Sequence, residues 1–246
     1  KIAGYGERIV KFRGHECTSL YSAEACGVRY PKTYYDGDAK YTGTLSSRLL
    51  VEAGFGINNW TWSNGERQRD VEITDIPRFD RTLLTRWSAR DGTERLWTAP
   101  RLVVGGAASY VTGSHAFKAG LWYDWGTSEN WIRLGRPGVV DLVQEYLNGV
   151  PSSVVVYNTP LFFSNRLNYE VSAYVQDSWK IRRLTVSPGI RLQWINSEIR
   201  PQVSGAGRFV PAREFAREQN MPKWGPDPAP RLGVAYDLFG DGKTAL

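Results

Sequence analysis

Alternation between apolar and polar residues is the dominant pattern of this chain. Four segments repeat with a period of two: residues 47–55, 115–125, 184–194 and 231–238. In each segment one face is apolar with an aromatic residue near its end, whereas the other face is small, polar or charged. Because successive side chains of a strand point to opposite sides, this pattern predicts half-apolar β-strands.

The connections between these strands are typical of a membrane barrel. Short polar turns are predicted at residues 44–46, 112–114, 180–183 and 239–243, and long loops at roughly residues 58–100, 126–165 and 195–228. Transmembrane β-barrels combine short turns on one side with long loops on the other. We therefore predict an all-β fold: an antiparallel up-and-down transmembrane β-barrel fragment, about seven or eight strands of a larger barrel, with long extracellular loops.

The long loops are expected to carry structure of their own, because structureless loops beyond about 15 residues are uncommon in compact domains. Asn148-Gly149, placed between two apolar runs, predicts a β-hairpin. Residues 212–219, AREFAREQ, predict a short helix.

A soluble β-sandwich would show the same alternation, with its apolar face as the core. The placement of aromatic residues favours the barrel. Membrane barrels carry aromatic belts at both interfaces, and the chain has 10 tryptophans and 13% aromatic residues. Those near predicted strand ends are Tyr110, Tyr123, Trp125, Trp179 and Trp194.

Composition narrows the possible functions. No run of about 18 apolar residues occurs, so a membrane-spanning helix is excluded. The net charge is +6, but it is spread without long runs of one sign, so nucleic acid is not an expected partner. We predict no enzyme and no cofactor, because only His15 and His115 are available as imidazole bases and no nucleotide or nucleophile motif occurs.

Two further groups of residues are candidates for specific roles. Asp70, Glu72 and Asp75 could mark a calcium site, but they lack the glycine and final glutamate of an EF-hand loop, so solvated charge is the preferred interpretation and no metal is predicted. Cys17 and Cys26 are predicted to form a disulfide after export, with two unpaired thiols as the alternative.

Side chains that could meet a ligand fall into two sets. Aromatic residues in or beside the long loops offer stacking area for a sugar or an aromatic ligand, or else pack the loops together; they are Trp60, Trp62, Trp97 and Trp131. Charged residues on the polar face are predicted to face a wet lumen, where they contact a plug or a solute or pair among themselves; they are Arg48, Glu52, Lys118, Arg191 and Arg231.

Several segments resemble the barrel of TonB-dependent outer-membrane receptors. They are SSRLLVEAGF, YVTGSHAFKAG, YVQDSWKIRRLTVSPGIRLQW, GRFVPAREF and PRLGVAYDLFGDGKTAL, in the order expected for the family. The resemblance covers residues 40–246 and is closest to the Oar-like subgroup, whose members carry an N-terminal carboxypeptidase-regulatory-like domain. Residues 1–40 match less clearly.

The resemblance implies that residues 1–246 are part of one receptor barrel of about 22 strands, whose plug and N-terminal domain lie outside this chain. The expected function is energy-coupled uptake or export of a bulky solute across the outer membrane of a Gram-negative type cell. Partners would be outer-membrane lipid, the solute and, through the plug, the TonB complex. The alternatives are a secreted β-rich glycan-binding module with exposed tryptophans, and a passive porin without a plug.

Overall fold

The computed structural model describes residues 1–11, 14–30, 32–68, 71–72, 74–134, 141–217, 221–241 and 243–244. Within those residues the regular structure is almost entirely β, and the one helical element is a short 3-10 turn, η1 (Ala23–Ala25). The predicted all-β class is confirmed.

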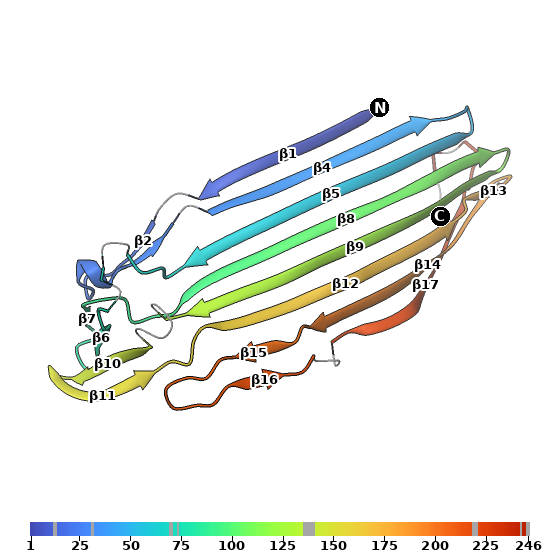
Figure 1. The fold of residues 1–246 in the computed structure, drawn as a ribbon. Coiled ribbons are helices and arrows are strands. Elements are labelled where there is room, and N and C mark those ends of the chain that lie inside the picture. The colour runs from blue at the N-terminus through green and yellow to red at the C-terminus, as the bar shows by residue number, and fades with distance from the viewer. Residues whose placement is uncertain are drawn as a thin grey trace.

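One antiparallel sheet dominates the molecule (Figure 1). Its long strands pair in chain order, so that each lies beside the next long strand of the sequence. In that order they are β1 (Ile2–Lys11), β4 (Lys32–Thr44), β5 (Leu49–Asn64), β8 (Glu94–Thr112), β9 (His115–Arg133), β12 (Leu161–Gln176), β14 (Leu184–Ile199) and β17 (Lys223–Tyr236). The short β13 (Trp179–Ile181) follows β12 and lies between β9 and β14. This up-and-down order is that of a barrel wall and agrees with the predicted barrel fragment.

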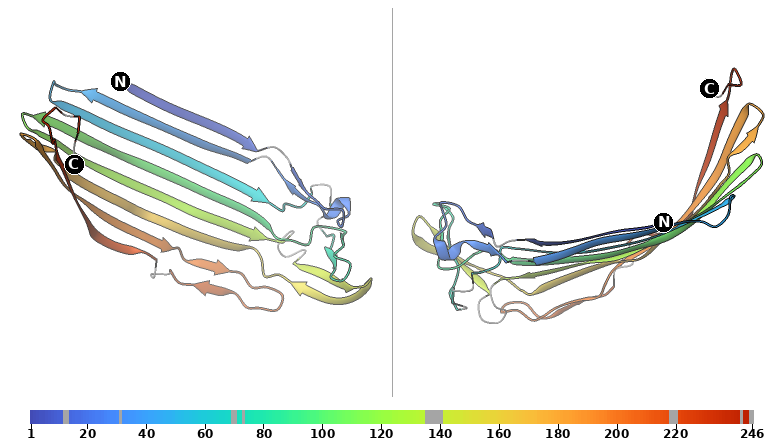
Figure 2. Two further views of the ribbon diagram at one scale, coloured as in Figure 1. Left: turned by 180° about the vertical axis from the view of Figure 1, so that it is seen from behind. Right: turned by 90° about the horizontal axis from the view of Figure 1, so that it is seen from above.

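The two ends of the sheet differ. At one end tight turns join the strands, at residues 45–48, 113–114 and 182–183. At the other end the chain forms smaller sheets, and Figure 2 shows the large sheet curving between the two ends. The small sheets are β11 (Val150–Val156), β10 (Leu142–Leu147), β6 (Arg78–Asp80) and β7 (Arg86–Trp87); β15 (Gln202–Ser204) with β16 (Arg213–Phe215); and β2 (Gly14–Glu16) with β3 (Gly27–Arg29).

The strands are longer than the sequence pattern indicates. β8 and β9 have 19 residues each, whereas a bilayer needs about 9–11 tilted residues. The predicted loop limits at residues 58–100, 126–165 and 195–228 are therefore wrong, because the strands continue to Asn64, Arg133 and Ile199. Beyond the bilayer neither face meets lipid, so the period-two signal fades although the strand pairing continues.

Two local predictions have opposite outcomes. The hairpin at Asn148-Gly149 is confirmed: both residues have positive φ, 49° and 81°, and they join β10 to β11. The helix at residues 212–219 is wrong, since Arg213–Phe215 forms β16 and pairs with β15; residues 218 and 219 lie outside the described residues. The pairing with β15 satisfies backbone groups that an isolated helical turn of this length would leave open.

Pairing register aligns the apolar positions of neighbouring strands. One row runs through Ala53, Gly106, Leu121, Ala173 and Leu192. Large apolar side chains on this face are exposed, with Leu121 at 55%, Phe55 at 46% and Val104 at 41%. A soluble sandwich would cover this face with a second sheet, whereas a barrel presents it to lipid.

Aromatic rings cover glycines on the opposite, polar face. A Cβ added at Gly105 would overlap the Trp122 ring and lie 2.7 Å from the carbonyl oxygen of Leu121. A Cβ at Gly120 would in the same way overlap the ring of Tyr174. The absent side chains therefore let these rings lie close to the sheet.

We expect Gly105→Ala to destabilise the sheet by about 2 kcal/mol, the usual cost of overpacking. The matched control is Gly54→Ala, because its new Cβ would meet Trp122 only at 3.8 Å, an ordinary contact. Stability can be measured as the temperature at which the folded band is lost on gel electrophoresis of the detergent-solubilised protein. Equal losses in both variants would contradict the expectation.

Candidate functional site

The polar face of the large sheet gathers most of the charged residues singled out from the sequence. Glu52 pairs with Ala107, which pairs with Gly120, and Lys118 lies two residues before Gly120 on the same face. Lys118 pairs with Gln176, Gln176 with Gly189, and Gly189 with Arg231, while Arg191 lies two residues beyond Gly189. Glu52, Lys118, Arg191 and Arg231 therefore share one face.

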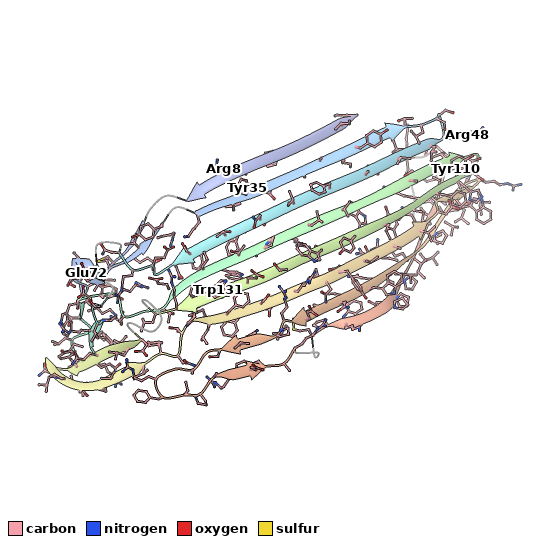
Figure 3. All side chains as sticks on the ribbon, viewed as in Figure 1. Arg8, Tyr35, Arg48, Glu72, Tyr110 and Trp131 are labelled. Atoms are coloured by element: carbon pink, nitrogen blue, oxygen red, sulfur yellow. A yellow bond between two sulfur atoms is a disulfide. The ribbon has the colours of Figure 1, made fainter. Side chains whose placement is uncertain are left out.

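Arg48 lies just outside the strand. It sits in the turn before β5, where its carbonyl oxygen accepts the Val111 N–H at 2.9 Å, and Figure 3 places it with Tyr110 at the turn end of the sheet. The strand begins one residue later, at Leu49, and the placement of the Arg48 side chain toward the lumen stays a prediction.

Ion pairs join neighbouring strands on this face, and one pair links β5 to β9 across β8. Glu52 on β5 accepts from Lys40 on β4 at 3.1 Å and from Lys118 on β9 at 3.3 Å. Arg101 binds both carboxylate oxygens of the buried Asp124, with Nε 3.0 Å from each. Nearer β14, Gln193 donates to Glu170 at 2.6 Å. Charges held this way on a sheet with an apolar opposite face suit a water-filled barrel interior.

A shallow groove crosses the middle of the polar face. It has a volume of about 510 Å³ and a floor of small residues that includes Gly54, Gly105 and Ala107. Lys118, Trp122 and Tyr174 contribute polar and aromatic groups to its lining. The two faces of the sheet therefore differ chemically: this face carries small and charged residues, whereas the opposite face carries apolar residues.

The four candidate tryptophans lie on strands rather than in loops. Trp60 and Trp62 are on β5, Trp97 is on β8 and Trp131 is on β9. They are therefore not in the long loops but beside them, since each lies within four residues of the loop end of its strand.

Three of these tryptophans share the polar face. Trp60 and Trp97 meet edge to face with ring centroids 5.1 Å apart, and Trp97 Nε1 donates to Ser128 Oγ at 2.8 Å. Trp62 pairs with Trp97 in the strand register. By alternation along β9, Trp131 lies on the opposite face. Its ring contacts that of Phe162, with the ring centroids 4.4 Å apart. Figure 3 shows Trp131 near the end of β9 that lies beside the small sheets.

Asp80 is an anchoring residue that the sequence pattern did not single out. It is 1% exposed, and its carboxylate accepts the N–H groups of Thr82 and Leu83, both at 2.9 Å, and of Asn148 and Gly149, at 3.3 and 2.6 Å. Burial by itself would raise the pKa of Asp80, but these four N–H donors outweigh it and lower the pKa below the usual value. Asp80 thereby fixes the β10–β11 hairpin to the loop that follows β6.

The remaining candidates have structural roles in the part of the chain that is described. Cys17 and Cys26 are joined by a disulfide, with Cα atoms 4.8 Å apart. Arg67 donates to the carbonyl oxygens of Glu72 and Asp75, at 3.1 and 2.9 Å, so these residues contribute backbone rather than carboxylate groups there; Asp70 lies outside the described residues. Over those residues no group of three or more metal-binding side chains occurs.

His115 belongs to the turn end of the sheet. Its Nδ1 lies 2.6 Å from Asp177 Oδ2, and its ring stacks between Phe117 and Trp179 at centroid distances of 5.2 and 5.3 Å. These contacts tie β9 to the segment between β12 and β13. A cluster of stacked rings at the turn end of the strands is typical of the aromatic girdle at the rim of a membrane barrel.

Comparison with known proteins gives one finding. A family model described as "Outer membrane beta barrel domain" matches residues 18–246. No curated protein matches the chain, and no solved structure does. Among the described residues, no helix is long and apolar enough to cross a membrane.

Proposed function

Because the chain belongs to the outer membrane beta barrel domain family and the protein is thus located in the outer membrane, we propose that it forms part of the barrel of a TonB-dependent receptor. Residues 1–246 contribute to a single barrel domain. The receptor takes up or exports a bulky solute through a plugged lumen, without catalysing a reaction. The Oar-like subgroup, with its carboxypeptidase-regulatory-like domain, supplies the nearest resemblance.

The observation that carries this proposal is the open sheet with two unlike faces. The sheet order runs from β1 to β17, and these two edge strands do not pair with each other. Unpaired strand edges are not tolerated in lipid, so more strands are needed to close the wall. The resemblance implies a barrel of about 22 strands, a size at which the lumen is plugged, and a plug is the element through which TonB acts in the receptors that the sequence resembles.

The proposed partners follow from the two faces. Outer-membrane lipid covers the apolar face, which includes Leu121 and Val104. The charged face, with its pairs of Lys40 and Lys118 to Glu52, suits a plug and a hydrated solute. No nucleic acid partner is proposed, since the net charge of +6 is spread along the chain without long runs of one sign. A secreted glycan-binding module fits an outer-membrane protein poorly, and a porin remains the competing transporter.

The test is whether transport requires energy from the inner membrane. The full-length protein would be expressed in outer membranes of cells with and without a functional TonB complex. The cells would be given a defined mixture of peptides, oligosaccharides and organic acids, and the disappearance of each solute from the medium would be followed by mass spectrometry. We expect uptake of at least one solute only when TonB is present and no protonophore is added. Uptake that is equal in all conditions would instead identify a passive porin.

A further inference from the structure

A second groove lies on the polar face near the turn end of the sheet, where β9, β12, β14 and β17 meet. Its volume is about 390 Å³. One register row crosses it, from Lys118 through Gln176 and Gly189 to Arg231. Arg191 lines it from the next position on the same face. We call this hollow, defined by Lys118, Arg191 and Arg231, the basic groove.

The basic groove holds more positive charge than its acids neutralise. Lys40 and Lys118 share the single carboxylate of Glu52, at 3.1 and 3.3 Å. Within the described part of the chain, neither Arg191 nor Arg231 forms an ion pair, in contrast to Arg101, which binds Asp124. The Nε of Arg191 is buried and lacks a hydrogen-bond partner there. A buried donor without a partner is costly, so a ligand that accepts from it gains binding energy.

The one acid that lines the groove is already engaged. Asp177 Oδ2 lies 2.6 Å from His115 Nδ1, and Asp177 Oδ1 accepts the Ala116 N–H at 3.2 Å. Its carboxylate is therefore turned to the β9 side of the turn rather than to Arg191 and Arg231. The remaining polar side chains of the lining are neutral and can donate; they are the hydroxyls of Tyr174, Ser178 and Ser187 and the amide of Gln176.

The pairing of β14 with β17 sets the distance between the two arginines of the basic groove. Arg191 pairs with Ala229 and Arg231 pairs with Gly189, so the two arginines are diagonal neighbours on β14 and β17. Diagonal positions of this kind lie about 7–8 Å apart, close enough for two guanidinium groups to converge on one anion. Gly189 has no side chain between Gln176 and Arg231, which leaves the floor of the groove open.

We propose that the basic groove binds an anionic solute that presents carboxylate or phosphate groups to Arg191 and Arg231. Guanidinium groups bind both kinds of oxyanion through two parallel N–H donors, and rings of Arg and Lys select anions in membrane pores. This inference deepens the proposed function by naming the chemical class of the solute, and it rests on that function for the placement of the polar face in the lumen.

The first experiment titrates the full-length protein in detergent with citrate, with inorganic phosphate and with glucose, using calorimetry at low ionic strength. We expect citrate or phosphate to bind and glucose not to bind. Arg191→Ala and Arg231→Ala should each weaken anion binding about tenfold or more, the effect of losing one charged hydrogen bond. In the unaltered protein, raising the salt concentration should also weaken anion binding, which tests the site without any mutation.

The matched control is Arg95→Ala. Arg95 lies on the same face of β8, far from the turn end, and it has no ion-pair partner in the described residues. Its loss removes the same charge and should change anion affinity less than about twofold. If Arg95→Ala weakens binding as much as Arg191→Ala, the effect is general charge attraction and the basic groove is not the site.

One other result would overturn the proposal. Absence of citrate and phosphate binding would show that the arginines do not serve a solute; if Arg191→Glu then lowers the thermal stability of the full-length protein, acidic groups of the protein itself occupy the groove. Failure of the transport proposal looks different: anion binding would persist and depend on Arg191 and Arg231, while uptake would not respond to TonB or to a protonophore.

Discussion

The Ala108→Arg variant should fail to assemble stably in the outer membrane, whereas Ala107→Arg should assemble. The two alanines are neighbours on β8 but lie on opposite faces. Ala108 pairs with Val51 and Ala119 on the apolar face, and Ala107 pairs with Glu52 and Gly120 on the polar face. An arginine toward lipid near the bilayer centre costs about 2–4 kcal/mol, while an arginine at Ala107 would face water and the carboxylate of Glu52.

Because both variants replace the same residue with the same side chain one position apart, strand propensity and added bulk are matched. Assembly would be measured as the fraction of protein that migrates as the folded form in unheated outer-membrane samples, followed by urea titration of that form. If Ala107→Arg is the more damaging of the two, the faces are assigned the wrong way round. If both are tolerated, the sheet does not contact lipid.

The wall of the barrel was predictable because lipid imposes a simple rule on it. Each strand between the interfaces must be apolar on every second residue, so Phe117, Leu121 and Trp125 mark β9 without further information. The same rule correctly placed Glu52 and Lys118 on one face, and the structure adds that they are 3.3 Å apart. It did not give the start of β5, since alternation locates a strand but not the residue at which a turn becomes that strand, and β5 begins at Leu49.

The outer halves of the strands were not predictable from that rule. Trp60 and Trp97 lie beyond the segments that lipid constrains, and their pairing depends on contacts 37 positions apart that no local pattern encodes. Residues 212–219 illustrate the complementary failure: AREFAREQ has the composition of a helix, but pairing of Arg213–Phe215 with β15 overrides that weak preference. Asp80 was missed because half of its hydrogen-bond donors, Asn148 and Gly149, lie far along the chain.

The attachment of the β10–β11 hairpin to the loop that follows β6 should depend on the charge of Asp80, and it should weaken in acid. The folded pKa of this carboxyl lies below its ordinary value, so the group is more acidic in the folded loop than in the unfolded one. Its stabilising contribution is then fully present above the unfolded pKa, near 3.9, and is lost as pH falls through the folded pKa. Between pH 7 and about pH 5 the hairpin should be unaffected, and loosening should begin only below about pH 4.

Asp80→Asn should produce the loosened state at neutral pH. An amide keeps one acceptor oxygen but turns an NH₂ group toward some of the N–H donors, so Asn148 and Gly149 lose a charged acceptor. The measurement is hydrogen exchange of the peptide that contains these residues in the full-length protein, where we expect exchange to be about tenfold faster or more. Glu72→Gln is the control, because Glu72 is an exposed carboxylate in the segment that precedes β6. Equal acceleration in both variants, or an acid transition that survives Asp80→Asn unchanged, would assign the attachment of the hairpin to other contacts, such as the pairing of Gln144 with Arg78 between β10 and β6.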